Sequence, residues 1–252
     1  MTRLFDHHWW GRLLAGAALL LPMAASAQVL CVWDPMGAQG DGFNTLRDYT
    51  LPAKSWGPGV NITLRPYTDE RVATEDFKAG QCDGVLITGL RARQFNQFVG
   101  SIDSVGAIPS YTHMRDVIDL LANPKLAPNM VSGNYEIAGA VPIGAGYIFV
   151  NDRSINELSK AAGKKIAVFD WDKSQAEMVK MIGAQPVSAD VTTFAGKFNN
   201  GQADIIASPA MGYGPLELHK GIGKNGGVIR FPLLQATATI LIRRDMLLPK
   251  IP

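Results

Sequence analysis

The stretch EIAGAVPIGAGYIFV, residues 136–150, decides the fold. Its residues are almost all apolar or glycine, but Pro142, Gly144 and Gly146 interrupt it. A run this long and this broken is not typical of one ordinary strand. It fits a chain that leaves one lobe and enters another, and it therefore predicts two lobes joined by extended segments.

Strands and helices alternate before this stretch. The pattern predicts strands at 29–33, 60–67 and 84–88, and helices at 43–56, 69–79 and 91–98. This order is typical of a parallel sheet with right-handed crossovers. A helix at 112–122 and a proline-containing loop at 123–129 complete the first unit.

The second half repeats this order of elements. Ser154 and Glu157 have the spacing of a capping box, which predicts a short helix ending at Gly163. Further helices are expected at 173–182, 192–199 and 213–220, and strands at 165–169, 186–188, 204–208, 227–231 and 236–243. Residues 246–252 are expected to trail off without a closing helix. The domains are therefore a signal peptide (1–27), lobe 1 (28–140, with the return of 236–252), a hinge crossing (141–150) and lobe 2 (151–235).

The N-terminus predicts export. Arg3 and Arg12 form a positive n-region, residues 13–23 are an apolar run, and Ala25-Ser26-Ala27 is an A-x-A cleavage site. We expect a Sec-type signal peptide, a mature protein that begins at Gln28, and a location in the periplasm. An uncut membrane anchor is the alternative, although the apolar run is short for a span.

The net charge of the chain argues against nucleic acid as a partner. Removal of residues 1–27 lowers the formal net charge from +2 to +1, because two arginines and one aspartate leave. A nearly neutral chain without a basic stripe does not favour nucleic acid.

The chain has two cysteines, Cys31 and Cys82. An even number in an oxidising compartment favours a disulfide, and two buried thiols are the alternative. If the first lobe has the strand order 2-1-3, the strand of Cys31 neighbours the strand that begins at Gly84. A bridge between these positions is then within reach.

Several short motifs, in this order, resemble one family. They include INEL at 155–158, GKKIAV at 163–168, GAQPV at 183–187 and GQADII at 201–206. The succession is similar to that of TRAP-type, dicarboxylate-receptor-like periplasmic solute-binding proteins. CVWD at 31–34 and RPYTDERVATEDFKAGQCDG at 65–84 also resemble a further group of solute-binding proteins.

The resemblance covers residues 29–243 and implies an α/β, two-lobed periplasmic-binding-protein-like fold of type II with an inter-lobe cleft. It implies transport of an organic-acid-like solute. TRAP-type receptors carry an arginine clamp where this chain has Ala167, so that clamp is missing here. Such receptors also continue past this length, so a natural C-terminus and a truncated one are both alternatives here.

Ligands of open parallel sheets bind beyond the carboxyl ends of strands. Residues that follow such ends therefore form the predicted ligand site: Trp33, Asp34, Thr88, Arg91, Tyr147, Asp170, Trp171 and Ser208. Because Ala167 replaces the clamp, Arg91 is expected to hold an anionic group. The alternatives are a structural Trp33, a helix-capping Asp34, a solvated Arg91 and a core-packed Tyr147.

No motif predicts catalysis, a cofactor or a metal. GIGKNG at 221–226 follows a helix and precedes a strand, which is the reverse of the dinucleotide-binding context. His113 and His219 have no metal-ligand spacing, and no nucleophile–base pair is evident.

We therefore predict a monomeric solute-binding receptor that captures a small polar solute for membrane permease subunits, and not an enzyme. The alternative is an exported ligand-sensing regulator, or an enzyme built on the same scaffold.

Overall fold

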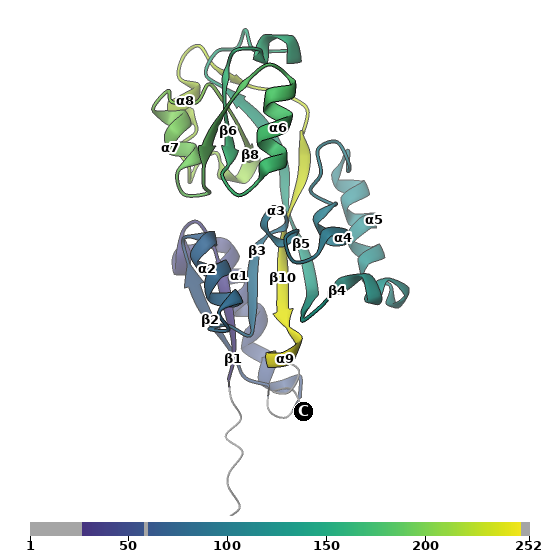
Figure 1. The fold of residues 1–252 in the computed structure, drawn as a ribbon. Coiled ribbons are helices and arrows are strands. Elements are labelled where there is room, and N and C mark those ends of the chain that lie inside the picture. Colours follow the sequence, from purple (N-terminus) through teal and green to yellow (C-terminus); the bar gives the residue numbers. More distant parts are fainter. Residues whose placement is uncertain (1–26, 58–59, 248–252) are drawn as a thin grey trace, which may run out of the picture.

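The computed structural model describes residues 27–57 and 60–247. The predicted signal peptide, apart from its last residue, lies outside the described residues, as do residues 248–252. Within the described ranges, no helix combines the length and the apolar character that a membrane crossing needs. The described chain forms two lobes joined by long strands (Figure 1).

Lobe 1, the lower body in Figure 1, is built on three parallel strands. β1 (Gln28–Trp33) lies between β2 (Ile62–Tyr67) and β3 (Gly84–Thr88). The order 2-1-3, on which the expected disulfide depends, is therefore present. Side chains such as Phe77 and Ile87 fill the core against this sheet and are fully buried.

Local caps determine where the helices of lobe 1 begin. The Asp69 carboxylate accepts hydrogen bonds from two main-chain N–H groups of the first turn of α2. The single helix predicted at 91–98 is wrong, because extended backbone at Asn96 divides it, and the Asn96 side chain caps a second helix. The elements are α1 (Asp41–Thr50), α2 (Glu70–Lys78), α3 (Gly89–Ala92), α4 (Gln97–Gly100) and α5 (Tyr111–Leu121), with 3-10 turns at Gly37–Gln39, Leu51–Ser55 and Pro124–Met130.

Lobe 2, the upper body in Figure 1, has the same strand–helix order. β6 (Lys165–Phe169) lies between two parallel neighbours, β7 (Gln185–Ala189) and β8 (Ile205–Pro209). Its other elements are α6 (Lys173–Met181), α7 (Phe194–Asn199), α8 (His219–Ile222) and β9 (Gly227–Val228), with 3-10 turns at Leu158–Ala161 and Ala210–Gly212.

Two helix predictions in lobe 2 are wrong. The capping box does not form, because Ser154 N donates to the Asp152 carboxylate, and only a 3-10 turn follows. Residues 213–220 are mostly turns. Glu217 has a φ of 51°, which interrupts a right-handed helix, so α8 begins after it.

Two long strands run side by side through the junction of the lobes (Figure 1). β5 (Tyr135–Val150) pairs antiparallel with β10 (Leu234–Arg243), and its last residues pair with β8 and β9. Residues 136–150 are therefore one strand, contrary to our expectation, because β10 supplies hydrogen-bond partners on both sides of the interruptions.

The hydrogen-bonded path of strands is continuous through both halves, in the order β2-β1-β3-β10-β5-β8-β6-β7. The two lobes therefore share one sheet, since β5 pairs with strands of both lobes. β10 also pairs with β3, and β4 (Val131–Ser132) pairs with the start of β5. A short helix, α9 (Arg244–Leu247), stands where the sequence predicts a trailing end.

The pairing of β5 with β10 is irregular between the lobes. The register shifts between Ala236 and Thr237, which lie opposite Gly144 and Pro142. Pro142 has no N–H to donate, and Gly144 has a φ of 108°, which favours glycine. This irregularity lies inside the predicted crossing at 141–150, whose bounds stay a prediction.

A buried carboxylate supports this irregular point. Asp103 is buried, and its carboxylate accepts hydrogen bonds from Thr237 N at 3.2 Å and from Thr237 Oγ1 at 2.8 Å. Gly89 leaves the space for it, because a Cβ there would overlap both side chains. Burial raises the pKa of Asp103 to about 6, against the hydrogen bonds from Thr237 and the charge of Arg93, which lower it.

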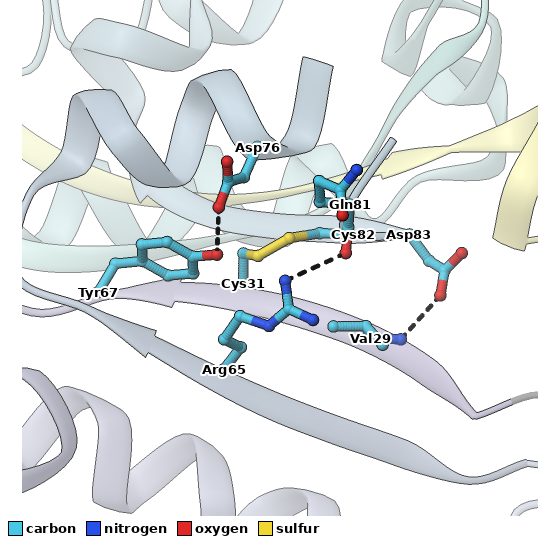
Figure 2. Close-up of a disulfide and its surroundings, with 8 residues drawn as sticks. All are labelled: Val29, Cys31, Arg65, Tyr67, Asp76, Gln81, Cys82 and Asp83. Carbon is cyan, nitrogen blue, oxygen red and sulfur yellow. Dashed lines mark hydrogen bonds between the residues drawn. A yellow bond between two sulfur atoms is a disulfide. The ribbon is translucent and has the colours of Figure 1, made fainter. Parts of the chain in front are cut away.

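The predicted disulfide between Cys31 and Cys82 is present, with a Cα–Cα distance of 5.9 Å (Figure 2). Cys31 lies in β1 opposite Val85 of β3, and Cys82 precedes β3. Next to the bridge, the Asp83 carboxylate accepts a hydrogen bond from Val29 N at 2.7 Å. The bridge and this hydrogen bond hold the turn before β3 against β1.

Replacement of both cysteines by alanine should lower the free energy of unfolding. The disulfide links residues separated by 51 positions, and the chain-entropy estimate for such a loop is about 4 kcal/mol, at the upper end of the roughly 2–4 kcal/mol that is typical of disulfides. Urea unfolding followed by circular dichroism measures the loss. The oxidised and reduced wild-type protein serves as control, and equal midpoints for the three samples would contradict the prediction.

Asp103→Asn should change the pH dependence of stability. The folded-state pKa of Asp103 lies above its ordinary value of 3.8, so the folded state holds this proton more tightly than the unfolded state does. The stabilisation that follows is complete below about pH 4 and is lost as the pH rises through about 6. The wild-type free energy of unfolding should therefore carry a downward component of about 3 kcal/mol over this window, which the variant lacks. Asp116→Asn, on an exposed position of α5, is the matched control.

Candidate functional site

The carboxyl ends of strands from both lobes meet at one junction. Thr88 is the last residue of β3. Its side chain accepts a hydrogen bond from Arg91 N and so caps the start of α3. Phe169 ends β6, and Trp171 and Asp172 follow before α6 begins. The segment after β3 and the segment after β6 are in contact, as the predicted site requires.

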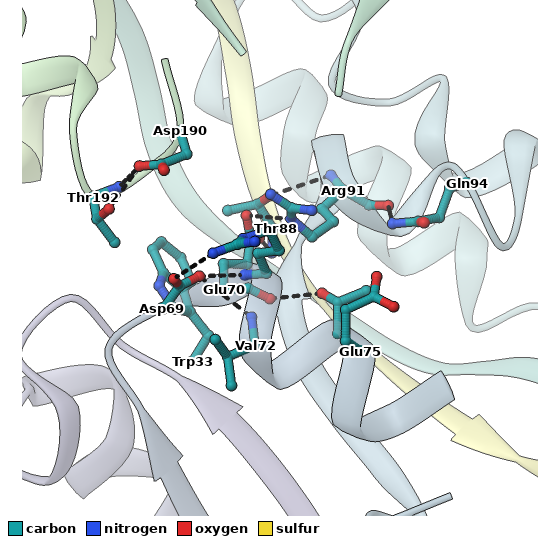
Figure 3. Close-up of polar contacts among 12 residues, drawn as sticks. Trp33, Asp69, Glu70, Val72, Glu75, Thr88, Arg91, Gln94, Asp190 and Thr192 are labelled. Atoms are coloured by element: carbon teal, nitrogen blue, oxygen red, sulfur yellow. Dashed lines mark hydrogen bonds and ion pairs between the residues drawn. The ribbon is translucent and has the colours of Figure 1, made fainter. Parts of the chain in front are cut away.

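Arg91 is buried and paired with a carboxylate of its own lobe. Its Nε donates to Glu70 Oε2 at 2.8 Å (Figure 3), and the two residues are 4% and 0% exposed. The other oxygen of Glu70, Oε1, accepts a hydrogen bond from Thr88 N at 2.7 Å. Both oxygens of Glu70 are therefore satisfied, and the guanidinium is neutralised from within lobe 1, which the sequence analysis did not anticipate.

Arg91 also reaches lobe 2. Its guanidinium carbon lies 4.5 Å from the ring centroid of Trp171, a cation–π distance. Trp171 stacks on Phe169, with centroids 5.4 Å apart and an interplanar angle of 6°. The indole Nε1 of Trp171 is buried and has no hydrogen-bond partner among the described residues. Arg91 and Trp171 thus form the centre of the junction.

A second contact crosses the junction. Arg93, two residues after Arg91, forms an ion pair with the buried Asp172 of lobe 2. Asp172 also caps α6 by accepting hydrogen bonds from Ser174 N and Gln175 N. The sequence analysis missed both partners of this pair. Asp170, which the sequence analysis selected instead, is exposed.

Trp33 and Asp34 have structural contacts. Trp33 Nε1 donates to Thr68 O at 3.3 Å, and its ring packs against the core of lobe 1. The Asp34 carboxylate accepts hydrogen bonds from Met36 N at 2.8 Å and from Phe43 N at 3.1 Å. Of the two roles weighed for Asp34, the contacts match the capping role.

Tyr147 and Ser208 lie opposite each other on β5 and β8. Tyr147 packs against the core of lobe 2, as its alternative interpretation expected. Ser208 is buried, and its Oγ donates to Pro209 O at 3.2 Å. The two residues form a pair inside lobe 2, and no described contact joins them to Arg91 or Trp171.

A surface hollow of about 540 Å³ lies elsewhere on lobe 1 and includes none of the predicted site residues. It is lined by Gln94, Phe95, Ser132, Gly133, Asn134, Tyr135 and Arg243. Among the described residues, no group of three or more His, Cys, Asp or Glu side chains could hold a metal ion.

Comparison with known proteins decides the family. The family model of the solute-binding proteins AdeT 1/2 matches residues 53–250. The chain belongs to the AdeT1/2 solute-binding protein family. It is 50% identical over 214 residues to the probable solute-binding protein AdeT1 of Acinetobacter baumannii, covering 85% of this chain and 70% of that protein. The probable solute-binding protein AdeT2 of the same species is 29% identical over 145 residues, which are 58% of this chain and 61% of AdeT2.

Solved structures confirm the two-lobed fold of this AdeT1/2 family member. A TRAP periplasmic solute-binding protein from Xanthobacter autotrophicus, with bound β-D-galacturonate, has a TM-score of 0.70 at 16% identity and covers 86% of this chain and 72% of its own. One from Desulfovibrio salexigens, with bound orotic acid, has a TM-score of 0.67 at 16% identity, with coverages of 87% and 70%. The predicted resemblance to solute-binding proteins is confirmed, and these relatives do not support the regulator or enzyme alternative.

Glu70 is the most informative residue that sequence reasoning missed in this AdeT1/2 family member. A signal for it exists, because a helix that follows a parallel strand begins at the carboxyl edge of the sheet. Glu70 is the first residue of α2, which follows β2, so it lies at the same edge as the end of β3. Its pairing with Arg91, 21 positions later, depends on side-chain placement that the sequence pattern does not contain.

Arg93→Gln and Asp172→Asn should weaken the inter-lobe contact in the AdeT1/2 family member. Asn keeps the cap of α6 while it removes the charge. Because Asp172 is buried, loss of its cation should lower the free energy of unfolding by roughly 1–3 kcal/mol, and the double variant should lose less than the sum of the single variants. Chemical unfolding and small-angle scattering measure stability and lobe separation.

Lys180→Gln, which removes an exposed ion pair of lobe 2 with Glu177, is the matched control. Additive losses of stability for Arg93 and Asp172 would show that the two residues do not interact in solution.

Proposed function

We propose that this chain captures a small polar solute between its two lobes in the periplasm and delivers it to membrane permease subunits. The observation that carries the proposal is the contact of Arg91 in lobe 1 with Trp171 in lobe 2, at the carboxyl ends of strands from both lobes. Membership in a solute-binding family supports it.

The physical mechanism is hinge closure. The lobes share β5 and β10, whose pairing is irregular at Pro142 and Gly144, so bending is concentrated there. A solute favours the closed arrangement only as far as it gains contacts that exist in that arrangement alone. Trp171 with Phe169 and the polar groups beside them supply such contacts.

The export signal and its cleavage before Gln28 belong to this proposal, since a receptor of this kind works outside the cytoplasm. The protein acts as a monomer and without catalysis. Organic acids are bound by the structural neighbours, as orotate and galacturonate are by the two described above and succinate by one from Sulfurospirillum deleyianum. These acids, together with sugars, amino acids and amines, form the panel for a ligand screen.

Trp171→Ala should weaken the binding of any solute that this screen finds. A bound solute stabilises the folded protein by about 2.7 kcal/mol at one hundred times its Kd, so thermal shift detects it. Loss of an aromatic contact at the centre of the junction should weaken binding by roughly ten- to a hundredfold in calorimetry. Trp56→Ala, at a half-exposed tryptophan of lobe 1 whose ring contacts Tyr49 of α1, is the matched control. Equal affinity of both variants for the solute would place the site away from the junction.

A further inference from the structure

We propose that Glu70 determines the charge of the solute: it is a built-in carboxylate that occupies Arg91, and the site takes a polar solute that carries no carboxylate of its own. The inference rests on the proposed function, because it concerns the solute bound at the same junction.

Glu70 is saturated and neutralises the charge of Arg91 from within lobe 1. Glu70 is completely buried and uses one oxygen for Arg91 Nε and the other for Thr88 N. The pair is therefore neutral as a unit. A second carboxylate brought to Arg91 would add an uncompensated negative charge in a desolvated place, which is costly.

Arg93, the other arginine of the junction, is already paired with the buried Asp172. Ala167, in the middle of β6, packs against the core of lobe 2 and supplies no charge. Each arginine that follows β3 to the junction thus has its own carboxylate from the protein.

Figure 3 draws two further carboxylates on one side of Glu70 and Arg91: Asp69 of lobe 1, which directly precedes Glu70, and Asp190 of lobe 2. Burial alone would raise the pKa of Asp190, but hydrogen bonds from Thr192 and Thr193 outweigh burial and lower the pKa, so this carboxylate stays ionised. Further negative charge at the junction repels an acidic solute.

The decisive variant is Glu70→Gln. The amide oxygen can still accept the hydrogen bond from Thr88 N, while its NH₂ group cannot accept from Arg91, so the guanidinium becomes available. The probes are succinate, D-galacturonate and orotate, each tested by thermal shift and calorimetry at millimolar concentration. We expect no saturable binding of the three acids to the wild-type chain, and a gain of at least about tenfold in affinity for one of them in Glu70→Gln.

Two controls accompany this variant. Glu75→Gln lies on an exposed position of the same helix, where Glu75 pairs with Lys78, and should gain no acid binding. Adding Arg91→Gln to Glu70→Gln removes both charges and should abolish the gain.

The wild-type measurement decides the matter even where Glu70→Gln does not fold. Saturable binding of any of the three acids to the wild-type chain overturns the proposal, and so does a folded Glu70→Gln that gains none. The proposed function fails on a different result, namely that the wild-type chain binds no compound of the whole panel. Even then, acid binding gained by Glu70→Gln would support the role of Glu70.

Discussion

The antiparallel pairing of β5 with β10 is the interaction on which the rest of the structure depends. β5 has 16 residues and is about 50 Å long, so one strand supplies hydrogen-bond partners to both lobes. β10 returns the chain to lobe 1 and joins β5 to β3. Because β5 and β10 carry the chain across the junction side by side, the two lobes are tied to each other there, and this pairing brings the segments after β3 and β6 within reach of each other.

The junction itself is built from charges that the protein has largely removed from water. A buried ion pair contributes little net stability, because desolvation of both partners offsets their attraction. Glu70 and Arg91 are nonetheless both buried and hydrogen-bonded to each other. Apolar residues at these two positions would stabilise the fold as well as the ion pair does. The free-energy cost of burying the two charges therefore indicates another role, which is to hold Arg91 against Trp171 and to set the charge of the junction.

Sequence reasoning succeeded where the signal is local or follows from a strand rule. β3 and β6 have the predicted bounds, and the order 2-1-3 led to the disulfide. It failed for β5, because Pro142 and Gly144 are typical of strand ends. The partner that keeps the strand continuous, β10, lies about a hundred residues later and cannot be recognised from the local sequence. In the site, the strand-end rule found Arg91 and Trp171. It did not find Glu70, Arg93 or Asp172, since pairing of buried side chains across elements depends on rotamers and on how the lobes meet.

Arg93 connects the two parts of this architecture. Its charge acts on Asp103, which holds Thr237 at the irregular point of β10, and its guanidinium pairs with Asp172 across the junction. The chain from the end of β3 to Asp103 therefore carries two arginines, Arg91 and Arg93, toward lobe 2 and one carboxylate toward the hinge strand. A movement of the lobes that separates Arg93 from Asp172 changes the field at Asp103 as well. We therefore expect the pKa of Asp103 to depend on the ion pair between Arg93 and Asp172, because Arg93 is one of the charges that lower that pKa.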